Sequence, residues 1–307
     1  MHPDGGDRFE QLKTQPRTAL SAATLGNFFN PTALYDAIAL KQAHPEAAFI
    51  AGGTDLGVNL SHGRSKATHF IALDRIAELH VLHTEREGLR VGAGIPLTRL
   101  ELELAGKFPL LDQLLPWFAA RQVRNRATIG GNLGSASPIG DLAPALLAMD
   151  AQLELVGPEG RRRLPVHGFF LDYRKTKRAP EELISAVLIP PQAGFIQAAY
   201  KVAKRQTDDI SIVAAMFSMA RDKEGRLSRV RLAFGGVAAI PLRATAVEEQ
   251  LDGLIPTSEN LRPIAEALSQ HFTPLSDHRA SAEYRRTLCR NLFVKFAREH
   301  LNVEIAL

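Results

Sequence analysis

Two glycine-rich segments constrain most strongly what this chain can fold into. The first, Phe49-Ile-Ala-Gly-Gly-Thr-Asp-Leu56, runs from an apolar strand into a glycine pair followed by a hydroxyl. Such a turn exposes consecutive backbone N–H groups that can bind a phosphate, with Thr54 as an additional donor. It has neither the GxGxxG dinucleotide fingerprint nor the lysine of a Walker loop. Taken alone, a turn of this kind is more often a plain tight turn.

The second segment makes a phosphate site the better interpretation. Residues 128–141, Thr-Ile-Gly-Gly-Asn-Leu-Gly-Ser-Ala-Ser-Pro-Ile-Gly-Asp, combine glycines, the small hydroxyls Ser135 and Ser137, and one acid. By itself Asp141, at the start of an expected helix, would be an ordinary N-cap. Two glycine loops of this kind suit a pyrophosphate that is held from both sides.

Composition limits the classes of protein to which the chain can belong. It has 307 residues, 45% of them apolar and 23% charged, which predicts a globular protein of about two domains. A surplus of 37 Lys and Arg over 33 Asp and Glu is too small to indicate nucleic-acid binding. The one cysteine, Cys289, excludes a disulfide framework, a cysteine-held iron–sulfur cluster and an all-thiolate zinc site within this chain.

Location and metal binding are also expectations from the sequence. No apolar stretch reaches the roughly 18 residues of a membrane span, so no membrane partner is expected. Residues 1–7 lack the basic start and apolar run of a secretory signal, and we expect a cytoplasmic protein. His80 and His83, three apart on an expected strand, would point to opposite faces, so no metal site is expected. Cys289 lies inside an expected helix and is expected to be buried and inert.

The apolar pattern predicts an α+β chain in two parts. We expect a linker or tail at residues 1–25, a domain with both glycine segments at 26–192, and a smaller domain at 193–307. Asn30 and Pro31 are expected to begin a helix, and another is expected at residues 109–120. The second domain is expected to hold a three-stranded antiparallel sheet (residues 198–204, 210–220 and 229–237) followed by helices.

Together with later segments, the two glycine loops resemble the FAD-binding domain of the xanthine dehydrogenase family. The later segments are Trp117-Phe-Ala-Ala-Arg-Gln-Val123, Phe170-Leu-Asp-Tyr-Arg-Lys-Thr176, Pro180-Glu-Glu-Leu-Ile184, Tyr200-Lys201 with Thr207-Asp-Asp-Ile210, and Ser276-Asp-His-Arg-Ala-Ser-Ala-Glu-Tyr284. The likeness covers about residues 25–303. It implies the flavoprotein fold shared with the medium subunit of carbon monoxide dehydrogenase and, more distantly, with vanillyl-alcohol oxidase-type flavoproteins.

The resemblance also implies which residues hold FAD. Phe118 would lie against the isoalloxazine ring, Lys201 near the flavin carbonyls, and Asp141 on a polar part of FAD. Asp208 would lie in a loop that influences access of NAD+, so Lys201 and Asp208 are modulating candidates, and no side chain is expected to act as a catalytic acid or base. The residues implied to bind FAD are Phe49, Ile50, Ala51, Gly52, Gly53, Thr54, Asp55, Leu56, Phe118, Thr128, Ile129, Gly130, Gly131, Asn132, Ser135, Ser137, Asp141, Leu183, Ile184 and Lys201.

The implied function is that of an electron-transfer subunit of a xanthine dehydrogenase-type molybdenum hydroxylase. Electrons would pass from iron–sulfur clusters to FAD and then as a hydride to NAD+, the iron–sulfur clusters and molybdenum cofactor being on partner chains. The alternatives are a flavin subunit of a related aldehyde, nicotinate or carbon monoxide dehydrogenase, or a non-catalytic nucleotide-binding interaction protein. The basic segments at residues 161–163 and 174–178 are expected to be solvated faces, and they are also candidate docking patches for partner subunits.

Overall fold

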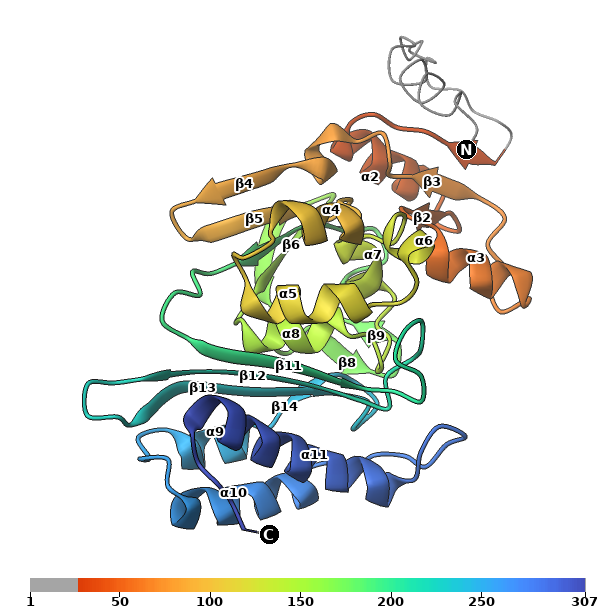
Figure 1. The fold of residues 1–307 in the computed structure, drawn as a ribbon. Helices are drawn as coiled ribbons and strands as arrows, with labels where there is room; N and C mark the ends of the chain where they lie inside the picture. Colours follow the sequence, from red (N-terminus) through yellow and green to blue (C-terminus); the bar gives the residue numbers. More distant parts are fainter. Residues whose placement is uncertain (1–26, 307) are drawn as a thin grey trace, which may run out of the picture.

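The computed structural model describes residues 27–306, so the expected tail at residues 1–25 lies outside the described residues. Figure 1 shows a small unit of sheet and helices at the N-terminal end, a central unit, and a sheet covered by helices at the C-terminal end. None of the helices within residues 27–306 is long and apolar enough to cross a membrane.

The N-terminal unit contains a small parallel sheet with strand order β1-β3-β2. Its elements are β1 (Phe28–Phe29), α2 (Leu34–Ala43), β2 (Ala48–Ile50), α3 (Thr54–Ser61), β3 (Phe70–Ala72) and the 3-10 turn η1 (Ala77–His80). Strand β2 passes directly through the first glycine pair into helix α3. The carboxyl edge of the sheet, where open parallel sheets bind ligands, is therefore formed by this turn.

The central unit is built around a five-stranded antiparallel sheet with strand order β4-β5-β10-β6-β7. Its strands are β4 (Leu82–Glu85), β5 (Gly88–Gly92), β6 (Gln152–Gly157), β7 (Gly160–Pro165) and β10 (Leu183–Ile189), and a small hairpin of β8 (Phe170–Asp172) and β9 (Lys175–Thr176) precedes β10. All seven residues of β10 are buried, as the near-continuous apolar run of a strand covered on both faces predicts.

A run of short helices connects β5 to β6. They are α4 (Leu97–Glu103), α5 (Pro109–Leu114), η2 (Leu115–Trp117), α6 (Arg121–Arg124), α7 (Ile129–Gly134) and α8 (Leu142–Ala148). Helices this short are not stable alone and depend on packing. Helix α8 is buried along its whole length, because it packs against β12 and β13 of the C-terminal sheet.

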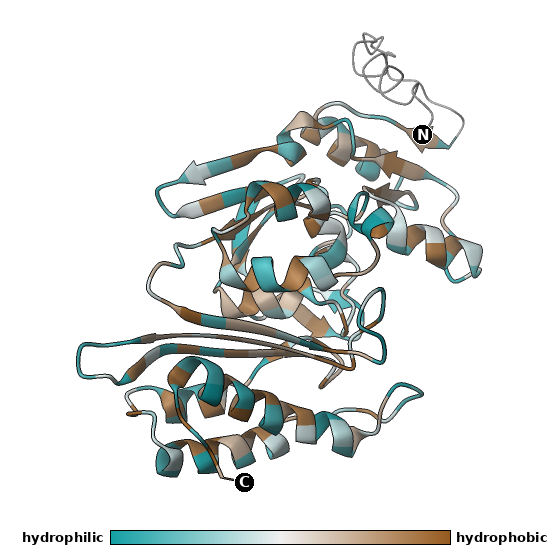
Figure 2. Ribbon diagram, in the orientation of Figure 1, coloured by the Kyte–Doolittle hydropathy of each residue, from teal (hydrophilic) through white to brown (hydrophobic). Residues whose placement is uncertain are grey.

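The C-terminal unit is an antiparallel sheet with order β11-β12-β13-β14, covered by helices on one face (Figure 1). Its elements are β11 (Ile196–Val202), β12 (Val213–Arg221), β13 (Leu227–Gly235), β14 (Leu242–Arg243), α9 (Thr245–Leu251), α10 (Ser258–His271), α11 (Ala282–Phe296) and a π-helical turn (Ala297–Leu301). Figure 2 shows polar and apolar residues alternating along α10 and α11, as expected of helices with one buried face.

Strand β12 contributes to two hydrophobic cores. Ala214 and Met216 belong to the core that also contains α8, whereas Val213, Ala215 and Phe217 belong to the core beneath the C-terminal helices. Successive side chains of a strand point to opposite faces, so one strand can complete both cores. The C-terminal sheet is therefore a layer shared by the two parts of the chain.

Four local features differ from the sequence expectations. His80 and His83 do not share one strand, because His80 ends the 3-10 turn η1 whereas His83 lies in β4. Helix α2 begins at Leu34, and residues 30–33 precede it without helical structure. The helix expected over residues 109–120 ends at Leu114 and continues as a 3-10 turn, because Pro116 cannot donate the hydrogen bond that would extend an α-helix. The three expected C-terminal strands are present, and β14 adds a short fourth one.

Candidate functional site: a cavity at the glycine turn

A cavity of about 910 Å³ lies where the glycine turn after β2 meets α7, β10 and the loop after β11. Small-molecule and cofactor sites typically span about 300–1,000 Å³, so the cavity is large enough for an extended cofactor. Of the residues that the sequence predicts for FAD binding, all except Ile129 line it. They are Phe49, Ile50, Ala51, Gly52, Gly53, Thr54, Asp55, Leu56, Phe118, Thr128, Gly130, Gly131, Asn132, Ser135, Ser137, Asp141, Leu183, Ile184 and Lys201.

The turn after β2 presents backbone donors to the cavity. A Cβ at Gly52 would lie 1.8 Å from the carbonyl oxygen of Arg126, so only glycine fits there. Gly53, the N-cap of α3, has φ +74°, a conformation that favours glycine. Within residues 27–306, no acceptor pairs with the backbone N–H groups of residues 54–56. The first turn of α3 therefore offers an anionic ligand three donors together with the positive end of a helix dipole.

The second glycine segment is built differently, because it folds into helix α7. Thr128 caps this helix, its Oγ1 accepting the N–H of Gly131 at 3.0 Å. The N–H groups of residues 129–132 all donate to acceptors within the protein. The N–H groups of residues 129–132 are therefore not available to a pyrophosphate, unlike those of residues 54–56. In the same segment, Oδ1 of Asn132 is buried with no donor among the described residues.

Three polar side chains from distant parts of the chain meet in the cavity wall. Oδ2 of Asp141 lies 2.8 Å from Nζ of Lys201, and its Oδ1 accepts the hydroxyl of Ser211 at 2.5 Å. The side chains of Asp141 and Lys201 are only 7% and 10% exposed, and Ser211 is buried. Asp141 occupies the N-cap position of α8, as the sequence suggests, but its side chain makes no capping hydrogen bond to that helix. We call these three residues the Lys–Asp–Ser triad.

Phe118 is held beside this triad by its backbone. Nζ of Lys201 donates to the carbonyl oxygen of Trp117 at 3.0 Å. The buried guanidinium of Arg124 donates to the carbonyls of Phe118 and Ala119, both at 2.9 Å. Ala119 has φ +45°, an uncommon conformation for a residue with a Cβ. Two cations thus fix the turn that places the Phe118 ring, 9% exposed, against the cavity.

The rest of the cavity wall includes both apolar and cationic side chains. Leu183 and Ile184 of the central strand β10 supply an apolar surface. Lys41 and Arg178, which the sequence reasoning missed, donate to backbone carbonyls, and burial lowers the pKa of both. Cationic side chains outnumber acidic ones in the lining, which favours an anionic ligand. The charged lining residues are Lys41, Arg64, Arg174, Arg178 and Lys201 against Asp55, Asp141 and Asp209.

Two of the sequence-predicted residues do not face the cavity. Ile129 is fully buried in the core behind α7. Asp208 is exposed, adopts φ +51°, and its carbonyl accepts a hydrogen bond from Arg205. Residues 209–211, which follow Asp208 directly, line the cavity in its place. Ser211 had no sequence signal except its position immediately after the segment Thr207–Ile210.

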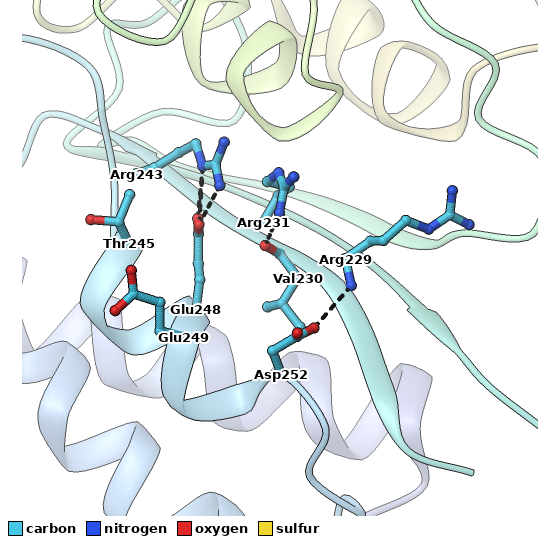
Figure 3. Close-up of a pocket in the computed structure, with 8 residues that line it drawn as sticks. All are labelled: Arg229, Val230, Arg231, Arg243, Thr245, Glu248, Glu249 and Asp252. Carbon is cyan, nitrogen blue, oxygen red and sulfur yellow. Dashed lines mark hydrogen bonds and ion pairs between the residues drawn. The ribbon is translucent and has the colours of Figure 1, made fainter. Parts of the chain in front are cut away.

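A second pocket, of about 490 Å³, lies beside β13 and α9 (Figure 3). Its arginines are already paired with acids or a ring. Arg243 pairs with Glu248 and Asp150, Arg231 with Asp150, and the guanidinium of Arg229 lies 4.2 Å from the centre of the Phe195 ring. Because three acids, Glu248, Glu249 and Asp252, line the pocket beside its three arginines, the pocket has no marked preference for an anion.

The basic segment 161–163 on β7 is similarly compensated. Arg161 pairs with Glu154, Arg162 with Glu182 at 2.6 Å, and Arg163 with Glu87 at 2.8 Å. Residues 174–178 include Arg174 beside Asp55 and Lys175 beside Asp172. These ion pairs remove much of the charge surplus on which the docking-patch hypothesis depends, and they agree with the interpretation as solvated faces.

The fold is α+β, and the cavity between the glycine turn and the polar triad has the size and the donors that suit an extended anionic cofactor. Residues 22–192 match the family model described as the FAD binding domain in molybdopterin dehydrogenase, and residues 198–300 match the C-terminal domain of the carbon monoxide dehydrogenase flavoprotein. This chain belongs to the family of FAD-binding domains of molybdopterin dehydrogenases, which confirms the resemblance inferred from its motifs.

Individual relatives agree with this assignment. A putative xanthine dehydrogenase FAD-binding subunit of Escherichia coli (strain K12) is 32% identical over 280 residues, which cover 89% of this chain and 95% of that protein. The xanthine dehydrogenase of Blastobotrys adeninivorans is 32% identical over 293 residues, and this chain spans only 21% of its length. A solved carbon monoxide dehydrogenase chain from Hydrogenophaga pseudoflava superposes with a TM-score of 0.83 at 29% identity, covering 90% of this chain and 96% of that one. The expected flavoprotein fold is thus confirmed.

The residues in the cavity fit FAD. The unpaired N–H groups of residues 54–56 match the anionic pyrophosphate, and the Phe118 ring matches a flat aromatic system. The orphaned Oδ1 of Asn132 needs a donor, which hydroxyl and amide groups of FAD can provide.

Proposed function

We propose that this chain carries the FAD of a xanthine dehydrogenase-type molybdenum hydroxylase and uses NAD+ as electron acceptor. The observation that carries the proposal is the cavity itself, with free N–H donors at the glycine turn and the buried Lys–Asp–Ser triad beside Phe118. The similarity to an E. coli protein described as a xanthine dehydrogenase FAD-binding subunit supports it. When bound, FAD supplies the capacity to accept electrons and to release them as a hydride.

The residues of the chain have separate tasks in this proposal. The first turn of α3 binds the pyrophosphate, and Phe118, Leu183 and Ile184 exclude water from the apolar parts of the cofactor. Lys201 places a positive charge near the flavin carbonyls, and Asp141 holds that ammonium at 2.8 Å. No side chain has to remove a proton from substrate, because the flavin carries the chemistry.

We further propose that the substrate is oxidised on partner chains. With one cysteine, this chain cannot hold an iron–sulfur cluster, which needs four protein ligands. In this proposal the iron–sulfur clusters and the molybdenum cofactor lie outside these 307 residues, on partner subunits. A division of the chain into domains at residues 26–192 and 193–307, and a cytoplasmic location, remain proposals from the sequence.

The test is to purify the 307-residue chain alone and to measure its cofactor and its activities. Heat should release FAD rather than FMN, because the cavity offers both a pyrophosphate site and a ring site. The chain should oxidise NADH with an artificial dye as acceptor, and it should not turn over xanthine. A colourless protein would instead support a non-catalytic nucleotide-binding role, and xanthine turnover without any metal would refute the proposal.

A further inference from the structure

Arg285 is a buried cation that the proposed function does not use. It lies on helix α11, 3% exposed, and none of the cavity-lining residues belongs to that helix. Its Nη1 donates to the carbonyl oxygens of Ile212 and Gly236, and its Nε has no acceptor within residues 27–306. A buried guanidinium with an unsatisfied N–H is costly, so stability alone is a poor explanation for this residue.

The segment Ser276–Tyr284, which stood out in the sequence, holds this guanidinium. Oδ1 of Asp277 accepts Nη2 of Arg285 at 2.9 Å and also the backbone N–H groups of Arg279 and Ala280. Partial burial by itself raises the pKa of Asp277, but these backbone donors and the guanidinium lower it to about 2. Ser281 caps α11 by accepting the N–H of Tyr284. The segment is thus a rigid turn built around the Asp277–Arg285 pair.

The first acceptor of Arg285, the carbonyl oxygen of Ile212, lies next to the Lys–Asp–Ser triad in the chain. Ile212 directly follows Ser211, whose hydroxyl donates to Asp141 at 2.5 Å, and Asp141 in turn binds Lys201. Fixing the carbonyl of Ile212 therefore fixes the backbone that carries the Ser211 hydroxyl. A displacement of that backbone would lengthen the hydrogen bond to Asp141.

The second acceptor, the carbonyl oxygen of Gly236, belongs to a residue that is hydrogen-bonded to another part of the cavity wall. The backbone N–H of Gly236 donates to the carbonyl oxygen of Pro138 at 2.9 Å, and Ser137 beside Pro138 lines the cavity. Gly236 has φ +79°, and a Cβ there would lie 2.3 Å from the carbonyl oxygen of Ile212. One guanidinium thus joins two backbone segments that both continue into the cavity wall.

We propose that Arg285 and Asp277 are positioning residues for the FAD site, through which the C-terminal helix sets the geometry of the Lys–Asp–Ser triad. The inference rests on the proposed binding of FAD in this cavity. Neither residue touches the cofactor. Their effect reaches it through Ser211 and Asp141, and it should therefore depend on the Ser211 hydroxyl.

The experiment uses the full chain and compares Arg285→Lys, Asp277→Asn, Ser211→Ala and the double variant Arg285→Lys/Ser211→Ala with the wild type. Arg286→Gln is the matched control, because Arg286 is the neighbouring arginine on α11 and is exposed. The measurements are the FAD dissociation constant, the reduction potential of bound flavin, and the Tm of the FAD-free protein. Asp277→Asn keeps the side-chain shape, so it remains informative if Arg285→Lys folds poorly.

We expect Arg285→Lys and Ser211→Ala each to weaken FAD binding about tenfold, the effect of losing one charge-assisted or buried hydrogen bond. Independent effects would multiply to about a hundredfold in the double variant, whereas a shared path leaves it near tenfold. The reduction potential should shift in both single variants and not shift further in the double one. Arg286→Gln should match the wild type in all three measurements.

Other outcomes overturn the inference. A lower Tm for Arg285→Lys with unchanged FAD affinity and potential would make Arg285 a structural residue only. A double variant weakened about a hundredfold would mean that Arg285 does not act through Ser211. A wild-type chain that binds no FAD would refute the proposed function and the inference with it, whereas FAD binding that is insensitive to all variants refutes the inference alone.

Discussion

Replacing Lys201 by methionine tests the charge arrangement of the cavity most directly. The ammonium of Lys201 lies 2.8 Å from Asp141 and 3.0 Å from the carbonyl oxygen of Trp117, and its side chain is 10% exposed. Methionine has a similar length but no charge, so Lys201→Met leaves a buried carboxylate with the Ser211 hydroxyl as its remaining side-chain partner. The turn that carries Phe118 loses one of its two cationic contacts as well.

The magnitude follows from the burial of the pair. Removing one partner of a buried ion pair costs about 3–5 kcal/mol, because the other charge stays buried without compensation. Since 1 kcal/mol moves the Tm of a domain of 150–250 residues by about 2–4 °C, the Tm of the FAD-free chain should fall by roughly 6–20 °C. The double variant Lys201→Met/Asp141→Asn removes both charges and should recover part of this loss. In the FAD-bound protein, Lys201→Met should also lower the flavin reduction potential, because a positive charge that stabilises the reduced ring is lost.

Thermal denaturation of the FAD-free variants and a potentiometric titration of the FAD-bound ones measure these effects. Lys223→Met is the control, because Lys223 is an exposed residue in the turn between β12 and β13. A Tm decrease for Lys201→Met no larger than that of the control would show that the pair does not stabilise the fold. A potential that stays constant or rises would show that Lys201 does not face the flavin ring.

Four further predictions address other parts of the molecule. Gly131→Val should weaken FAD binding, because a Cβ there would lie 2.9 Å from Oγ1 of Thr128 and would disturb the cap that places α7 in the cavity wall. Gly57→Ala, where a Cβ meets nothing within 4 Å, should retain FAD, and equal FAD content in both variants would contradict the site. Asp208→Ala should change the kinetics of NADH oxidation, and unchanged kinetics would show that this exposed residue does not influence the reaction with NADH. Burial raises the pKa of Cys289 to about 12, so iodoacetamide should label it only after denaturation, and rapid labelling of the native chain would refute its burial. The pKa of Asp277, about 2, is below the value of about 3.9 expected for an unfolded chain. The ionised carboxylate therefore stabilises the fold fully above pH 4, and this stabilisation is lost as the pH falls towards 2. The Tm deficit of Asp277→Asn should shrink over that interval, and a constant deficit would contradict the shift.

The local sequence was sufficient to predict a structural feature wherever the interactions that determine this feature lie within one segment. The glycine pair after β2 predicts a turn with free N–H groups, because Gly53 itself must adopt φ +74° and the first turn of a helix has no internal acceptors. Helices α9, α10 and α11 follow from their own apolar periodicity. The family resemblance rests on motifs of this local kind.

Only the tertiary structure decided how these segments act together. The second glycine segment is rich in glycines and hydroxyls, but the carbonyls of residues 95 and 93 accept the N–H groups of residues 129 and 130, which leaves those two groups unavailable to a ligand. Asp141 has the sequence position of an N-cap, yet its oxygens bind Lys201 and Ser211, which lie 60 and 70 residues further along the chain. Hydrogen-bond partners that come from distant segments produce no periodic pattern in the sequence. The sequence therefore determined which helices and strands form, whereas the packing of these elements determined which donors and charges reach the cavity.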